Sequence, residues 1–205
     1  MPSNTRRKKH SVPKTSAKKQ GALGSVRIIA GKHRGRKLLV RDAEGLRPTT
    51  DRMKETLFNW LIGEVVGTKV LDLYAGSGSL GFESLSRGAA EVTFFELDKN
   101  NYHLIQENAK QLDAEQEVKI HHGDSFELLK KQNTQFELVF VDPPFNKNLL
   151  KSSLNALIEE NSLTDGAKIY IEHEANLRLD LPNCFEIDKQ KKTKSLHTAL
   201  LVFHQ

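Results

Sequence analysis

Sulfur and long apolar segments are scarce in this chain. It has one cysteine, Cys184, among 205 residues, so no disulfide can form within it. No apolar run approaches the roughly 20 residues that cross a bilayer, and the first residues lack the pattern of a signal peptide. We therefore expect a cytoplasmic protein with no membrane partner.

Groups of metal ligands are also missing. Eight histidines are present, but His121 and His122 have no cysteine or carboxylate at the spacing of a metal site. We therefore expect no bound metal. His173 follows a predicted strand, and we interpret it as a solvated residue, with a place in a substrate cleft as the alternative.

Acidic residues are rare in the first quarter of the chain. Residues 1–54 hold sixteen Lys and Arg against three acids, a charge of +13, whereas residues 55–205 hold fifteen against twenty-three, a charge of −8. An acidic body repels a polyanion unless a basic region delivers it. This asymmetry indicates a nucleic-acid partner bound through the N-terminal region.

The composition divides the chain into three parts. Residues 1–24 mix basic residues with Ser, Thr, Pro and Gln without any helical or strand period, which predicts a disordered basic tail. The alternative is a solvated or expression-related segment. Residues 25–50 predict a small hairpin, and residues 51–205 a single globular domain long enough to bury a sizeable core.

Short apolar strands alternate with helical segments through the globular part. That order predicts an α/β fold with a mostly parallel sheet and helices on both faces. Two runs around the basic stretch 189–194 predict a closing antiparallel hairpin. By analogy with other folds of this class, we expect its last strand beside the fourth parallel strand. The parallel strands are expected at Val70, Val92, Val118, Leu138 and Ile169.

The motif Asp142-Pro143-Pro144-Phe145 directly follows the apolar run 138–141. A carboxylate and a carbonyl of the turn can accept hydrogen bonds from both N–H groups of an exocyclic amine, which frees the lone pair of its nitrogen. The prolines fix the turn, and Phe145 can stack on a base swung out of its helix. The alternative is an ordinary strand-ending turn with Phe145 in the core.

A glycine loop follows the first predicted parallel strand. Gly76, Gly78 and Gly81 have the spacing of a dinucleotide-binding fingerprint, and Glu96 ends the next strand, where it can accept hydrogen bonds from ribose hydroxyls. Such a loop serves nicotinamide cofactors and S-adenosylmethionine equally well. Asp72 favours the latter, because a carboxylate there would repel a pyrophosphate but attract a cationic amino-acid tail.

These motifs resemble those of class I S-adenosylmethionine-dependent methyltransferases that modify exocyclic amines. The segment 45–60, with the basic segment 27–37 before it, resembles one family within that class. This is the RsmD family, which methylates the N2 amine of a guanine in bacterial small-subunit (16S) ribosomal RNA. The resemblance covers about residues 26–203 and implies a Rossmann-like, seven-stranded sheet with an antiparallel last strand and an N-terminal β-hairpin.

The resemblance implies roles for individual residues. The glycine loop would hold the methionine end of the cofactor, the acidic strand end its ribose, and the turn after the third strand its adenine. The segment 49–55 would close the cofactor site, although the same residues also suit an ordinary helix N-cap. The cofactor-binding residues expected are Asp72, Ala75, Gly76, Ser77, Gly78, Glu96, Leu97, Asp124, Ser125 and Thr50.

The resemblance also implies catalytic and RNA-binding residues. Asp142, Pro143 and Pro144 would orient the target amine while Phe145 stacks on the base. The expected partner is small-subunit RNA, free or within a 30S particle, and the expected state is a monomer. The RNA-binding residues expected on and near the hairpin are Arg34, Arg36, Lys37 and Arg47.

Other functions stay open on the sequence alone. A DNA adenine-N6 methyltransferase shares the Asp-Pro-Pro-aromatic motif, and a nicotinamide-dependent oxidoreductase shares the glycine loop. A non-catalytic RNA-binding assembly factor is the alternative that is not an enzyme. Retention of Asp72, Glu96 and Asp142 argues against that last function.

Overall fold

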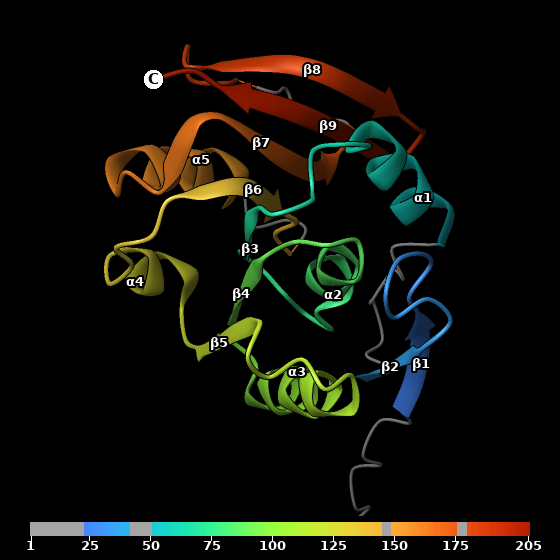
Figure 1. Cartoon of the computed structure of the whole chain (residues 1–205). Helices are drawn as coiled ribbons and strands as arrows, with labels where there is room; N and C mark the ends of the chain where they lie inside the picture. Colours follow the sequence, from blue (N-terminus) through green and yellow to red (C-terminus); the bar gives the residue numbers. More distant parts are fainter. Residues whose placement is uncertain (1–22, 42–50, 145–148, 176–179) are drawn as a thin grey trace, which may run out of the picture.

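A seven-stranded sheet forms the centre of the protein in a computed structural model, which describes residues 23–41, 51–144, 149–175 and 180–205 (Figure 1). The strand order is β5-β4-β3-β6-β7-β9-β8, and only β9 runs against the others. This confirms the expected Rossmann-like class I methyltransferase sheet. The strands are β3 (Lys69–Asp72), β4 (Glu91–Glu96), β5 (Val118–His122), β6 (Phe136–Val141), β7 (Leu163–Glu174), β8 (Phe185–Lys192) and β9 (Leu196–Phe203).

Helices cover both faces of this sheet, as Figure 1 shows. One face packs on the helices α1 (Asp51–Trp60), α2 (Ser79–Ser86) and α3 (Lys99–Gln111), and the other on α4 (Ser125–Leu129) and α5 (Leu149–Glu159). Each face has its own buried apolar cluster because successive strand residues point to opposite sides. No helix in the described ranges is long and apolar enough to span a membrane.

The position of the last strand differs from the expectation. β9 lies between β7 and β8, so it neighbours the fifth parallel strand rather than the fourth. The fourth strand, β6, is already paired on both sides, with β3 and with β7. β7 pairs with β9 over seven residues, from Lys168 to Glu174. The free edge of β7 was therefore the position where β9 could pair.

Close packing beneath α2 depends on a glycine. A Cβ atom at Gly81 would lie 2.2 Å from a ring carbon of Phe94 on β4, well inside any real contact distance. The rings of Phe94 and Phe82 in turn pack with their centroids 4.9 Å apart. Gly81 thus lets the helix approach the sheet, which fixes the direction in which the glycine loop enters it.

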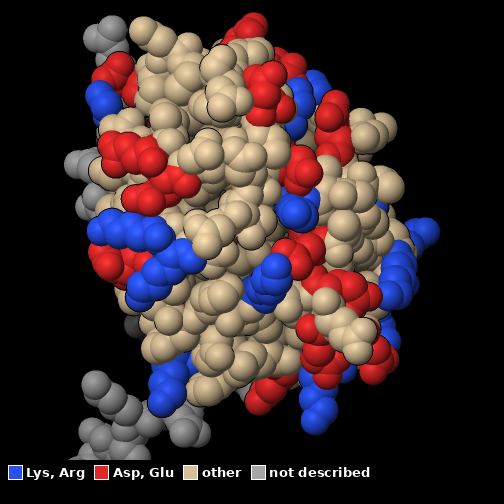
Figure 2. All heavy atoms as spheres, turned by 60° about the vertical axis from the view of Figure 1, so that its left-hand side comes forward, with Lys and Arg blue, Asp and Glu red and all other residues tan. Residues whose placement is uncertain are grey.

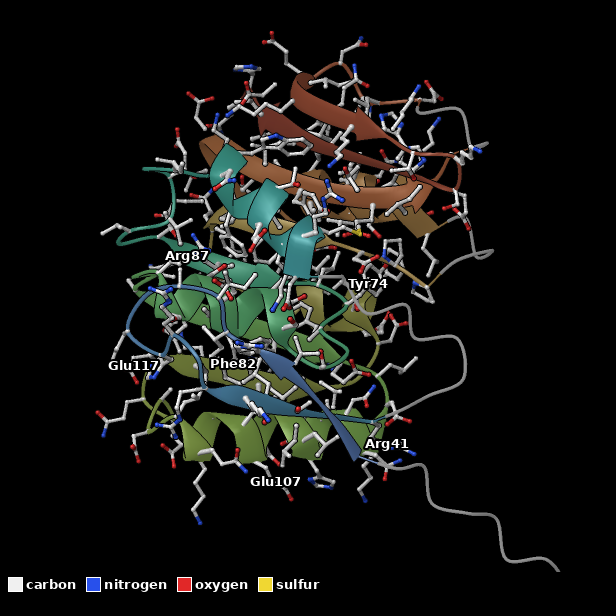
Figure 3. The ribbon with its side chains drawn as sticks, turned by 90° about the vertical axis from the view of Figure 1, so that its right-hand side faces the viewer. Arg41, Tyr74, Phe82, Arg87, Glu107 and Glu117 are labelled. Atoms are coloured by element: carbon white, nitrogen blue, oxygen red, sulfur yellow. The ribbon has the colours of Figure 1, made fainter. Side chains whose placement is uncertain are left out.

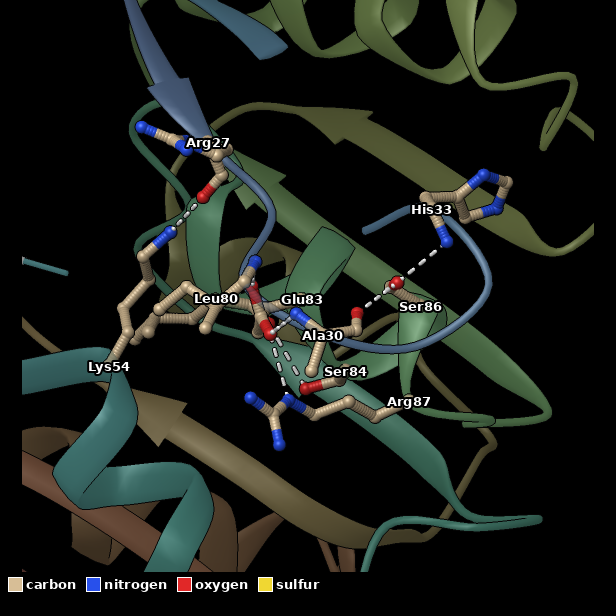
Figure 4. Close-up of polar contacts among 10 residues, drawn as sticks. Arg27, Ala30, His33, Lys54, Leu80, Glu83, Ser84, Ser86 and Arg87 are labelled. Carbon is tan, nitrogen blue, oxygen red and sulfur yellow. Dashed lines mark hydrogen bonds and ion pairs between the residues drawn. The ribbon is translucent and has the colours of Figure 1, made fainter. Parts of the chain in front are cut away.

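The N-terminal hairpin consists of β1 (Leu23–Arg27) and β2 (Lys37–Arg41), joined by residues 28–36. It docks on α3, where the Asn108 side chain accepts a 2.7 Å hydrogen bond from the Leu39 N–H and donates a 3.0 Å bond to the Leu39 carbonyl. It docks on α2 through polar contacts of the segment 28–36 (Figure 4). The hairpin is therefore held firmly on one face of the domain.

Candidate active site

The parallel strands end at one edge of the sheet, here called the carboxyl-terminal edge. Asp72 ends β3, Glu96 ends β4, and Asp142 follows β6 directly. Strand alternation places all three on the face that carries α1, α2 and α3. The structure therefore brings together the three carboxylates that the sequence singled out, at the edge where open α/β sheets bind their ligands.

The glycine loop is tied to the ends of two strands. The Ala75 N–H donates to the Phe95 carbonyl at 3.0 Å, and the Gly76 N–H donates to Glu96 Oε2 at 2.6 Å. Gly76 and Gly78 have φ values of 54° and 74°, in the left-handed region that favours glycine. Ser77 between them is half-buried. The loop is thus preformed as a tight turn beneath the start of α2.

Asp72 lies beneath this loop and is 4 % exposed. Its Oδ2 accepts a 3.1 Å hydrogen bond from the Gly81 N–H. The pKa of Asp72 is raised to about 7: burial is the main cause, the bond from Gly81 lowers the pKa, and the charge of Glu96 raises it. A cationic ligand placed here would favour the ionised carboxylate and gain from it.

This shift predicts a pH-dependent stability. Because the folded pKa of Asp72 is raised from 3.8 to about 7, its contribution to stability is greatest below pH 4 and falls as the pH rises to 7. Asp72→Asn keeps the acceptor for Gly81 and removes the titration. We expect the difference in free energy of unfolding between this variant and the wild type to shift by about 2 kcal/mol in favour of the variant when the pH is raised from about 5 to about 8. The reason is that one proton contributes about 1.4 kcal/mol per pH unit.

Urea unfolding at the two pH values measures this gain. Asp113→Asn is the matched control, because Asp113 is exposed and has a φ of 52° that asparagine tolerates. Parallel pH profiles for Asp72→Asn and the wild type would contradict the prediction.

Glu96 faces the same loop. Its Oε1 accepts from the Asp98 N–H at 2.6 Å and its Oε2 from the Gly76 N–H, and burial raises its pKa. A carboxylate has about four acceptor positions, so these bonds leave room for a ribose hydroxyl. Leu97 follows at the strand end and is 65 % exposed, which makes its apolar side chain accessible to a flat ring.

Asp124 and Ser125 lie after β5 at the same edge. The Asp124 carboxylate caps α4, accepting from the N–H groups of Phe126 at 3.0 Å and Glu127 at 3.3 Å. Ser125 is buried and donates to the Leu73 carbonyl at 2.7 Å. Both side chains thus already have structural partners, and the turn they form lies directly beside the end of β3.

Asp142 also has a strongly perturbed carboxyl group. Burial raises its pKa well above the usual range, and the charges of Glu172 and then Asp72 raise it further. Pro143 is buried and Pro144 is exposed. The fourth member of the expected group, Phe145, lies outside the described residues, as do Thr50 and Arg47.

A carboxylate that the sequence reasoning missed adjoins Asp142. Glu172 is 4 % exposed and lies on β7, one residue beyond the Val141–Ile171 pair, so it is level with Asp142 on the same face. The Tyr170 hydroxyl donates to Glu172 Oε1 at 2.7 Å. A glutamate at an inward position of an apolar strand is the sequence signal that could have revealed it.

His173, which we expected to be solvated, is instead buried. It is 2 % exposed, and its ring packs edge-on against that of His197 with the centroids 4.7 Å apart. The interpretation as a solvated residue is therefore wrong. Alternation along β7 turns His173 to the α5 face, away from Glu172 and Asp142.

The fit of the site to a cofactor can be judged from its polar atoms. Three buried or half-buried carboxylates with raised pKa values suit a cation better than a phosphate. The hydroxyl of Ser79, at the start of α2, is buried without a hydrogen-bond partner among the described residues. A polar cofactor tail would satisfy it. The part of the chain that the structure describes contains no group of three or more potential metal ligands.

The expected RNA-binding residues of the hairpin lie at the other end of the molecule. Arg36 donates to the Gln111 carbonyl at the end of α3, and exposed Arg34 and Lys37 lie in or beside the same turn. Figure 3 shows the two ends, with Arg41 and Tyr74 at the carboxyl-terminal edge and Arg87 and Glu117 opposite. Contact of this turn with RNA stays a prediction.

The fold and the arrangement at this edge define a class I methyltransferase. A family model described as conserved hypothetical protein 95 matches residues 26–202. The chain is 47 % identical over 175 residues to ribosomal RNA small subunit methyltransferase D of Haemophilus influenzae, covering 84 % of this chain and 91 % of the relative. The chain therefore belongs to the RsmD family of methyltransferases.

Solved structures agree with this assignment. A putative methyltransferase, YhhF, from Escherichia coli superposes with a TM-score of 0.82 at 40 % identity, covering 88 % of this chain and 99 % of that one. An RNA methyltransferase from Salinibacter ruber, solved with S-adenosyl-L-homocysteine, shares the fold alone at 16 % identity and a TM-score of 0.57. It covers 77 % of this chain and 94 % of its own.

Proposed function

We propose that this protein transfers a methyl group from S-adenosylmethionine to the exocyclic N2 amine of a guanine in small-subunit (16S) ribosomal RNA. The observation that carries the proposal is the position of Asp142 and Pro143, at the end of β6 and on the same edge as the glycine loop. The relative from H. influenzae, whose name gives small-subunit ribosomal RNA as its substrate, supports the choice of RNA.

The cofactor would bind across the ends of β3 and β4. Asp72 and the Ser79 hydroxyl would hold the charged amino-acid end, and Glu96 would accept hydrogen bonds from the ribose. Leu97 and the turn at Asp124 would border the adenine. When bound, S-adenosylmethionine supplies an electrophilic methyl group on a sulfonium.

The catalytic turn would act on the nucleophile. The Asp142 carboxylate and the Pro143 carbonyl would each accept one N–H of the amine, which frees the nitrogen lone pair to attack in line. The nitrogen would become positively charged as its new N–C bond forms and the bond from the methyl group to sulfur breaks, leaving a neutral thioether, and it would then lose one proton. Because burial and Glu172 raise the pKa of Asp142, this carboxylate can receive that proton directly before passing it to water.

We further propose that the protein acts as a monomer, in the cytoplasm where the RNA is assembled into subunits. Whether naked RNA or a 30S particle is preferred is left to the experiment.

The test uses methyl-labelled S-adenosylmethionine with unmodified small-subunit RNA, both naked and as assembled particles. The RNA is then digested and the labelled nucleoside identified. Label in N2-methylguanosine is the expected result. Label in another nucleoside, or label only in DNA adenine, would overturn the choice of base or of nucleic acid, and no label in any substrate would overturn the activity.

A further inference from the structure

The turn between β8 and β9 lies at the carboxyl-terminal edge, close to Asp142. β8 runs in the same direction as β6 and β7 because both β7 and β8 are antiparallel to β9. The register pairs Glu172 with Thr198, and Thr198 with Lys191, so these residues form one row with Asp142 across the sheet. Three strand spacings separate β6 from β8, which is about 14 Å.

This turn and the end of β8 before it are strongly basic and exposed. Lys191 and Lys192 end β8, Lys194 lies in the turn, and every residue from 189 to 195 is exposed. Asp188, the acid just before this stretch, lies 3.6 Å from both Lys168 and Lys189. Within the described ranges no acidic side chain forms an ion pair with these three lysines, whose charges are therefore available to a ligand.

The turn is also braced rather than loosely attached. The Lys189 amine donates to the Trp60 carbonyl at the end of α1 at 2.9 Å, and the Lys191 amine reaches Thr56 Oγ1 at 3.5 Å. The Thr193 N–H donates to the Leu196 carbonyl at 2.8 Å, and the Leu196 N–H to Thr193 Oγ1 at 3.0 Å. A braced turn places its charges at a fixed distance from the catalytic edge.

Its charge contrasts with the rest of the surface. On the face turned forward in Figure 2, Lys and Arg side chains are interspersed with Asp and Glu, and most of the surface between them is uncharged. The body from residue 55 onward carries a net charge of −8. Three lysines within four residues, on the same edge of the sheet as Asp142, can hold a polyanionic substrate close to the carboxylates and offset their repulsion.

We propose that Lys191, Lys192 and Lys194 bind backbone phosphates of the substrate RNA beside the flipped nucleotide. The inference rests on the proposed function and deepens it, since it names the surface that holds the RNA at the catalytic edge. Phosphate contacts fix the register of a nucleic acid without reading its sequence. These lysines therefore position the target base, while Asp142 acts on its amine.

The test is the salt dependence of RNA binding, followed by fluorescence anisotropy with a labelled fragment of small-subunit RNA. K191Q/K192Q/K194Q removes three charges. We expect the slope of log K against log salt to become shallower by about two, at about 0.7 per lost phosphate contact on single-stranded RNA. In methylation assays the KM for RNA should rise by a larger factor than kcat falls.

A matched control, K69Q/K110Q/K131Q, removes three exposed lysines that lie outside this turn and form no ion pair among the described residues, and it should leave the slope unchanged. K192Q/K194Q spares the contact of Lys191 with Thr56 and separates loss of charge from loss of folding. An unchanged slope in the triple variant would overturn the inference even where methylation persists. The inference would also be overturned if the triple variant lost binding only to assembled particles and not to naked RNA, because that result would indicate a ribosomal protein as the partner.

If the wild-type protein methylates no RNA, but the triple variant still binds RNA with a shallower salt dependence than the wild type, only the proposed function is overturned. The two failures are thus distinguishable, because binding is measured without turnover.

Discussion

Replacing Asp142 with alanine should lower turnover by about a hundredfold or more, the scale of losing one oriented polar group in an active site. The cofactor affinity should change by only a few-fold, because Asp72 and Glu96 at the neighbouring strand ends remain in place. Single-turnover methylation measures the first quantity and calorimetric titration with S-adenosylmethionine the second. Near-normal turnover would refute the role of Asp142.

Asp142→Asn separates two contributions of this residue. The amide keeps one acceptor oxygen for the amine but cannot receive its proton. We expect turnover between those of the wild type and Asp142→Ala. Asp113→Asn, an exposed acid distant from the catalytic edge, is the control for the change of charge. If the kcat of Asp142→Asn equals that of the wild type, Asp142 does not accept the proton and its role is limited to orienting the amine.

Much of the catalytic edge could be predicted because its signals are local. The apolar run before Asp142 and the glycines after Asp72 specify a strand end and a tight turn within a few residues each. Parallel strands connected by helices must end at one edge, so their terminal carboxylates had to meet there. The seven-stranded order and the N-terminal hairpin follow the family resemblance.

The remaining features depend on contacts between distant parts of the chain. The place of β9 was decided by the free edge of β7, and the approach of Glu172 to Asp142 by the register of two strands thirty residues apart. The docking of the turn that carries Arg34 at the ends of α2 and α3 likewise joins segments that are far apart in the sequence. Neither the hydrophobic period nor the composition contains that information.

Glu83 is the clearest case of a residue that only the structure explains (Figure 4). It lies on α2 and is 0 % exposed. Its carboxylate accepts from the Ile29 N–H at 2.8 Å, the Ala30 N–H at 3.1 Å and Arg87 Nε at 2.8 Å. Nearby, the buried Lys54 amine donates to the Arg27 carbonyl at 2.7 Å. Glu83 thus joins the hairpin to the helix that begins at the glycine loop.

The backbone around this contact leaves no room to adjust. Gly31 has a φ of 85°, and a Cβ atom there would lie 1.7 Å from the Ser86 carbonyl oxygen. The Ser86 hydroxyl donates to the Ala30 carbonyl at 2.5 Å and accepts from the His33 N–H at 2.9 Å. The segment therefore cannot move to satisfy its N–H groups elsewhere if Glu83 is changed.

Glu83→Gln should accordingly destabilise the protein by about 3–5 kcal/mol, the usual cost of breaking a buried ion pair at one partner. The amide leaves the Arg87 charge without its carboxylate and turns one N–H donor toward another. Urea unfolding measures the loss, and hydrogen exchange at Ile29 and Ala30 localises it. Glu91→Gln is the control, since its partly exposed ion pair with Lys119 should contribute no more than about 1 kcal/mol.

Equal stability of the two variants would show that the hairpin is held by apolar packing, through buried Ile28 and Leu38, rather than by this carboxylate. A large loss at Glu83 together with normal cofactor binding in the remaining folded protein would place the hairpin outside the cofactor site. A parallel loss of cofactor affinity would instead mean that the hairpin stabilises α2, and through α2 the glycine loop at its start.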